Sequence, residues 1–72
     1  MSHFEAPEHR EIVKEVQIGE QEWVVMGREP FRPERFSYCT WIGNRCGLER
    51  GHYSMSLQEA EEDMMDRIRH GN

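Results

Sequence analysis

The sequence predicts an α+β fold: a three- to four-stranded antiparallel sheet, in the order β-β-β-(β)-α, with one C-terminal amphipathic helix packed on one face. Three observations predict this fold. Residues 11–18 alternate in polarity and are followed by a glycine, residues 36–42 are rich in aromatic and β-branched side chains, and residues 56–71 carry the signals of one short helix. Because a helix with one apolar stripe can cover one face of a strand meander, this order of elements favours two layers.

The first two strands are expected on either side of a tight turn. Residues 11–18 alternate with the period of two that is typical of a strand with one better-buried face. Gly19 and Glu20 fit a two-residue type II′ turn, which takes glycine in its first position. Residues 22–26 then return as the second strand, which ends at Gly27.

A polar connection separates this hairpin from the rest of the sheet. Residues 28–35 hold two prolines and five charged side chains, so they cannot form a central strand. Residues 36–42 are expected to form the third strand. Residues 43–47 mark a turn, after which residues 48–53 return as a short fourth strand.

The C-terminal helix has clear start and stop signals. Ser56, followed three residues later by Glu59, forms a capping box, and Gly71 offers a left-handed stop. The apolar stripe recurs at spacings of three and four and contains Leu57, Ala60, Met64, Met65 and Ile68. The opposite face carries Glu59, Glu62, Asp63 and Asp66. A helix of this length is marginal alone in water, so its stripe must pack on the sheet.

The expected core combines the helix stripe with the sheet face beneath it. It comprises Val16, Ile18, Trp23 or Val24, Val25, Tyr38, Thr40, Ile42, Leu57, Met64 and Ile68. Alternation sends to the other sheet face Trp41, Cys39 and one of Trp23 or Val24. That face is open to solvent or to a partner unless the N-terminal arm or the 28–35 connection folds over it. An aromatic side chain on an open face hints at a binding surface.

The chain of 72 residues is expected to form one small domain. We assign residues 1–10 to a flexible N-terminal arm and residues 11–72 to a single α+β domain. No apolar run approaches the roughly 18 residues of a membrane span, and no hydrophobic signal region begins the chain, so we expect a cytoplasmic protein without membrane contact. The two cysteines should then stay reduced, and a homodimer would enlarge the thin core.

The pattern of the cysteines and histidines argues against a metal or catalytic site. Cys39, Cys46 and His52 follow one another at intervals too wide for the paired ligands typical of structural zinc. A Cys–His catalytic pair among them is compatible with the spacing, but no oxyanion-loop signature accompanies it. We therefore expect no enzyme, no metal and no cofactor, and keep a small enzyme or metal protein built on these three residues as a third hypothesis.

The charge distribution favours a protein partner with a basic surface. The net charge is -5, and residues 57–70 carry five acids against two arginines, so this segment contributes -3. Such a field repels nucleic acid and attracts cationic proteins, although most acidic helix faces are only solvated. The candidate protein-binding residues are Glu59, Glu62, Asp63, Asp66 and Trp41.

An alternative is a nucleic-acid-binding regulator that uses the arginine-rich connection and the sheet aromatics. Its candidate residues are Arg28, Arg32, Arg35 and Arg45. Three strands followed by a helix is also the topology of small DNA-binding domains that lay a sheet in the major groove. Those domains are normally basic, whereas Glu29, Glu34 and Glu49 lie in the same part of this sequence.

One resemblance adds context. The residues that carry it are Thr40-Trp41, Gly51-His52-Tyr53, Ala60, Asp63-Met64 and Arg67. They resemble the pattern T-W…G-H-Y…A-x-x-D-F-x-x-R of small uncharacterised proteins from mobile elements and phages of Gram-positive bacteria, in which phenylalanine often stands in place of Met64. No activity is attached to that group. The resemblance implies that residues 51–53 form a fixed joint, with Tyr53 packed against the start of the helix.

Together these observations predict a small, acidic, non-enzymatic protein-binding or regulatory module. In its sharpest form it is a mobile-element or phage inhibitor of a host nucleic-acid-binding defence protein. The helix carboxylates would then mimic DNA phosphates in the channel of that host protein.

Overall fold

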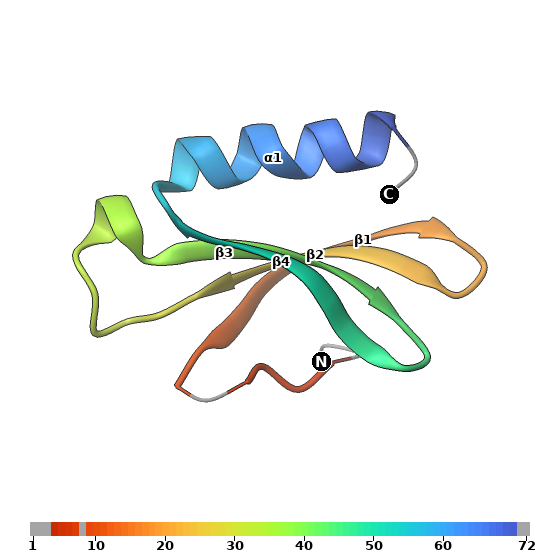
Figure 1. The fold of residues 1–72 in the computed structure, drawn as a ribbon, viewed down its shortest axis with the longest axis horizontal. Coiled ribbons are helices and arrows are strands. Elements are labelled where there is room, and N and C mark those ends of the chain that lie inside the picture. The colour runs from red at the N-terminus through yellow and green to blue at the C-terminus, as the bar shows by residue number, and fades with distance from the viewer. Residues whose placement is uncertain (1–3, 8, 71–72) are drawn as a thin grey trace.

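The structure, a computed structural model, describes residues 4–7 and 9–70. Its elements are β1 (Glu11–Gly19), β2 (Glu22–Arg28), a short 3₁₀ helix (Glu34–Phe36), β3 (Tyr38–Asn44), β4 (Gly47–Met55) and α1 (Leu57–Arg69). The strands form one antiparallel sheet in the order β1-β2-β3-β4, and α1 lies across one face of it (Figure 1). The predicted α+β fold is therefore confirmed, with four strands. No helix in the described part of the chain is long and apolar enough to cross a membrane.

The turn between β1 and β2 lies one residue later than predicted. Gly19 pairs with Glu22, so Glu20 and Gln21 make the turn, and Gly19 has no positive φ. The predicted type II′ turn with Gly19 in its first position is therefore wrong. The ladder is irregular between Gln17 and Gly19, and the Gln17 side-chain amide donates to the carbonyl oxygens of Gly19 and Glu20 at 2.9 and 3.2 Å. This bulge moves the turn along the chain.

The third strand starts two residues later than predicted. The backbone N–H of Phe36 donates to the carbonyl of Pro33 at 2.9 Å, and that of Ser37 donates to Glu34 at 3.3 Å. These bonds close a 3₁₀ turn, so Phe36 ends the connection rather than opening β3.

β4 is bulged twice, which decides where its side chains point. Its nine residues run beside the seven of β3, and the register shifts on both sides of the pair Thr40–His52. Arg50 and Ser54 lie at these shifts with φ values of 55° and 61°. A regular ladder counted from the turn would put Gly51 opposite Thr40. The first bulge therefore rotates His52 onto the helix face.

α1 begins where the sequence predicted. The backbone N–H of Glu59 donates to Ser56 Oγ at 3.1 Å, and the N–H of Ser56 donates to Glu59 Oε1 at 2.9 Å, which completes the capping box. His70 is the C-cap residue. The predicted stop at Gly71 lies outside the described residues.

Each face of the sheet carries a core. The core under α1 contains Val24, Met26, Tyr38, Ile42, Ala60 and Met64, with Val16, Ile18 and Met55 packed against it. The second core contains Val25, Cys39 and Trp41, with Phe4, Ile12, Trp23 and Leu48 packed against it. The predicted alternation of β3 is confirmed, but Val25 belongs to the second core.

Two helix residues predicted to be in the core are exposed. Leu57 and Ile68 are 41% and 37% exposed. The reason is the position of α1, which packs mainly on β2, β3 and β4. Ile68 faces a groove beside β1, and Leu57 lies at the start of the helix next to Glu34 and Arg35 of the 3₁₀ helix.

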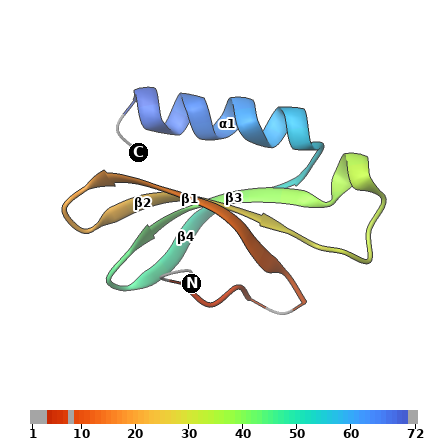
Figure 2. The ribbon, with the colours of Figure 1, turned by 180° about the vertical axis from the view of Figure 1, so that it is seen from behind.

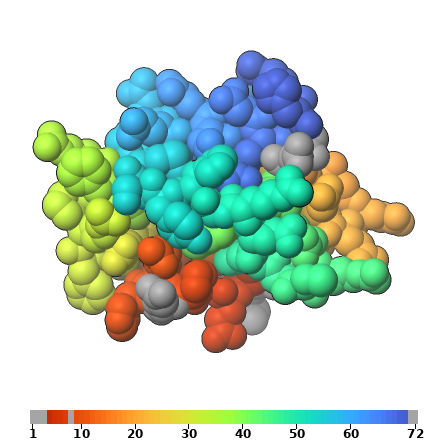
Figure 3. Space-filling model, viewed as in Figure 1, coloured from red at the N-terminus to blue at the C-terminus, as the bar shows by residue number. Residues whose placement is uncertain are grey.

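The N-terminal segment covers the second face. Phe4 packs edge-on against Trp23, with ring centroids 5.6 Å apart, and lies so close to Gly43 that a Cβ there would overlap its ring. The Arg10 guanidinium stacks on the Tyr53 ring at 5.0 Å. Figures 2 and 3 show the segment beneath the sheet, on the side away from α1.

Candidate functional site

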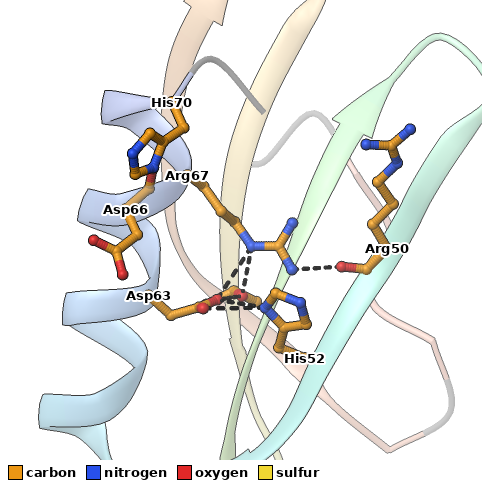
Figure 4. Close-up of polar contacts among 7 residues, drawn as sticks. Arg50, His52, Asp63, Asp66, Arg67 and His70 are labelled. Carbon is orange, nitrogen blue, oxygen red and sulfur yellow. Dashed lines mark hydrogen bonds and ion pairs between the residues drawn. The ribbon is translucent and has the colours of Figure 1, made fainter.

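Four polar side chains meet between α1 and the sheet. The Asp63 carboxylate accepts hydrogen bonds from Thr40 Oγ1 on β3, from His52 Nδ1 on β4 at 2.9 Å, and from Arg67 Nε one turn along α1 at 3.1 Å (Figure 4). The sequence prediction placed Asp63 on the exposed helix face. Its side chain is only 23% exposed and points toward β4, so that placement is wrong.

Arg67 is the most deeply buried charged group of this cluster, with 6% of its side chain exposed. Its Nη2 donates to the backbone carbonyl of Arg50, and its Nε also lies 3.0 Å from Thr40 Oγ1. The Arg50 carbonyl belongs to the first bulge of β4. Arg67 therefore joins the helix to an irregular stretch of the edge strand. Its guanidinium is hydrogen-bonded to the Asp63 carboxylate through Nε and to the Arg50 carbonyl through Nη2.

The polar cluster fixes the tautomer of His52. An ionised carboxylate can only accept hydrogen bonds, so His52 Nδ1 carries the proton. The other ring nitrogen, Nε2, then carries no proton in the neutral ring, and the His52 side chain is 55% exposed. Burial opposes ionisation of Asp63, but hydrogen bonds from Thr40, His52 and Arg67 outweigh it and lower the pKa of this carboxyl below its ordinary value. Asp63 is thus ionised at neutral pH.

The cysteines lie apart from this cluster. Cys39 is buried in the second core, on the other face of the sheet from His52, and burial raises the pKa of its thiol. Cys46 is exposed in the turn between β3 and β4. Among residues 4–7 and 9–70, no group of three or more His, Cys, Asp and Glu side chains could hold a metal ion. The structure therefore does not bring Cys39, Cys46 and His52 together.

The other predicted acidic residues remain on the surface of α1. Glu59, Glu62 and Asp66 are exposed, although Glu59 also closes the capping box. We call these three residues the acidic side. Glu61, on the flank facing β1, lies 3.8 Å from the Lys14 ammonium.

Trp41 does not lie on an open surface. It is 2% exposed, its Nε1 donates to Tyr53 Oη at 2.9 Å, and the two rings meet edge to face at 6.1 Å. The sequence prediction correctly directed Trp41 to the face away from α1 and left open whether that face is exposed or covered. The N-terminal segment and Tyr53 cover it, so Trp41 is not available as a binding residue on an open face. Tyr53 accordingly packs on the side away from α1, not against the helix start.

The candidate nucleic-acid-binding arginines are dispersed and mostly engaged. The partners are Glu11 for Arg28 (3.4 Å), Glu29 and Ser54 for Arg32 (4.0 and 3.1 Å), and the Phe36 ring for Arg35 (5.1 Å). Arg45 lies in the turn at the far end of β3, about 20 Å of strand from the other three. The four arginines therefore do not form one basic patch.

Sequence reasoning missed Arg67, the buried cation of the cluster. A signal for it was present: Ala60, Asp63, Met64 and Arg67 recur at i, i+3, i+4 and i+7, the spacing of one helix face. The same four positions occur in the pattern quoted for the resemblance, together with Thr40 and His52. Asp63 and Arg67 were not assigned to the sheet-facing side of the helix because that side was identified from its hydrophobic residues alone.

Comparisons with protein-family models, with curated proteins and with solved structures find no match to this chain.

Proposed function

We propose that this chain is a small, non-enzymatic protein-binding module that acts in the cytoplasm. The acidic side of α1 would bind a basic surface on its partner. One observation carries the proposal: Glu59, Glu62 and Asp66 are exposed on one side of a helix whose opposite side is fixed to the sheet. A helix that is fixed to the sheet favours electrostatic recognition, because the backbone that carries the charges loses little conformational freedom on binding.

The density of the acidic side supports the sharper form of the proposal. Glu59 and Asp66 are seven residues apart, which is about 10 Å along a helix. One strand of DNA presents a phosphate about every 3.4 Å of its axis, hence about three over the same distance. Three exposed carboxylates match that density. In this form the chain is a mobile-element or phage inhibitor that takes the place of nucleic acid on a host defence protein.

The polar cluster has a supporting role in this proposal. Asp63 and Arg67 neutralise each other beneath α1, so they contribute little to the outward field. What they supply is a fixed orientation of α1 on β3 and β4. The acidic side is presented in one direction as a result.

The test is charge reversal with a matched control. The double variant Glu62→Lys/Asp66→Lys should lose binding to basic DNA-binding proteins, measured by competition against a fluorescent DNA duplex at several salt concentrations. The variant Glu20→Lys/Glu22→Lys makes the same charge change at the exposed β1–β2 turn and should keep it. Equal behaviour of the two variants would contradict the proposal.

Nucleic-acid binding is the alternative outcome of the same assay. It predicts direct, salt-dependent retention of the duplex by the chain alone, weakened by replacing Arg28, Arg32 and Arg35. The ion pairs of Arg28 and Arg32 with glutamates of the same chain argue against this alternative.

A further inference from the structure

α1 carries a second apolar stripe that the core does not use. Leu57, Met65 and Ile68 are 41%, 56% and 37% exposed. Together with Glu61 they follow one flank of the helix at spacings of three and four, next to the acidic side. We call these three residues the outer apolar row.

A groove lies between β1 and the part of this row formed by Met65 and Ile68. It is lined by Lys14, Val16, Glu61, Met64, Met65 and Ile68, with a volume of about 270 Å³. Met64 and Val16 belong to the core under α1 or pack against it, so the groove opens a route to that core. β1 is an edge strand of the sheet and lies toward the viewer in Figure 2.

The size and lining of the groove fit side chains better than a small molecule. Its volume lies just below the roughly 300–1,000 Å³ of ordinary ligand pockets. Two methionines form part of its wall, and methionine adapts its shape to different apolar partners. Two of the lining residues, Lys14 and Glu61, form an ion pair in which each side chain is 52% exposed. A surface pair of this kind costs little to open.

We propose that this groove receives an apolar side chain from the same basic partner, flanked in that partner by arginine or lysine. The inference rests on the proposed function, because the partner that binds the acidic side would also contact the outer apolar row next to it. The charge of α1 favours a cationic occupant. Glu61 lines the groove, and three further exposed acids form the acidic side of the same helix. A second copy of the chain would bring the same negative field against itself. A cationic segment meets attraction instead.

The edge of β1 argues for insertion of a side chain rather than addition of a strand. The β1–β2 ladder is irregular between Ile12 and Lys14 and again between Gln17 and Gly19. Only residues 14–17 keep a regular edge, and bulges of this kind protect sheet edges from pairing. The groove beside that edge remains accessible to an anchor residue.

The experiment uses two synthetic cationic peptides of equal length and charge. One carries leucine at two positions one helical turn apart, and the other carries serine there. Fluorescence anisotropy should show that the leucine peptide binds the chain about tenfold more tightly, because one leucine leaves water. The variant Met65→Ser/Ile68→Ser should reduce its affinity to that of the serine peptide. The control Val13→Ser removes an equally exposed apolar group away from the groove and should leave the affinity unchanged.

The outcomes separate this inference from the function on which it rests. If both peptides bind equally and Glu62→Lys/Asp66→Lys weakens both, the acidic side binds cations but the groove takes no anchor. If that charge reversal affects neither peptide, the proposed function itself fails. Sedimentation should find a monomer. A dimer that Met65→Ser/Ile68→Ser dissociates would overturn the inference, because a second copy would then fill the groove.

Discussion

Arg67→Met is the substitution with the largest expected effect on stability. Methionine keeps much of the aliphatic stem, but it removes the guanidinium that binds Asp63 and the Arg50 carbonyl. Removing one partner of a buried charge pair costs about 3–5 kcal/mol. Asp63 is 23% exposed and keeps Thr40 and His52, so we expect a smaller loss, about 2–3 kcal/mol.

That loss is large for a chain of this length. At 0.05–0.15 kcal/mol per residue, 72 residues correspond to about 4–11 kcal/mol of total stability. A domain of this size loses about 4–8 °C in Tm for each kcal/mol, so Tm should fall by about 10–20 °C.

Urea unfolding followed by circular dichroism measures the free energy, and a thermal scan measures Tm. The matched control is Arg69→Met, which removes the same group from the exposed surface of the same helical turn and should change stability by less than about 0.5 kcal/mol. If Arg67→Met is no more destabilising than Arg69→Met, the polar cluster does not hold α1 to the sheet.

One further prediction concerns Asp63 of the polar cluster, and two concern the second core on the other face of the sheet. Asp63 has a lowered pKa in the folded state, so its stabilising effect is complete above the unfolded pKa of about 4 and is lost as the pH falls through the lower folded value. The stability gap between wild type and Asp63→Asn, measured by urea unfolding at several pH values, should therefore shrink below about pH 4; a constant gap would contradict this. Gly27→Ala should lower the free energy of unfolding, measured in urea, by about 1–3 kcal/mol, because its Cβ would lie 2.5 Å from the buried Trp41 ring. Gly43→Ala should mainly displace Phe4, and limited proteolysis should then cut the N-terminal segment faster. Tyr53→Phe removes the hydrogen-bond acceptor of Trp41 Nε1 and should lower the free energy of unfolding by about 1–2 kcal/mol, measured by thermal unfolding. The control Phe31→Leu, at a position that is 84% exposed, should not lower it.

The parts of the fold that the sequence predicted depend on neighbours in the chain. The capping box needs only Ser56 and Glu59, and the alternation of β3 follows from residues 38–42. Both were confirmed. The third strand began too early in the prediction because phenylalanine is common in strands. In the structure, the N–H of Phe36 donates a hydrogen bond to the Pro33 carbonyl and so closes a 3₁₀ turn.

The candidate site could not be predicted in the same way, because it depends on register between distant segments. His52 reaches Asp63 only since β4 gains an extra residue at Arg50, and nothing local requires a positive φ there. Alternation also predicted the face on which Trp41 lies, but it could not decide whether that face is open or covered. Phe4 and the segment after it supply that cover from the other end of the chain.

The two unpaired residues of β4 make this strand sensitive to insertion and deletion. Inserting one residue between Glu49 and His52, with the bulge unchanged, would move His52 opposite Cys39 and so to the other face of the sheet, with every amino acid of the cluster still encoded. A lengthened β1–β2 turn would disturb no such pairing. Within β4, therefore, the number of residues constrains the protein more tightly than their identity does.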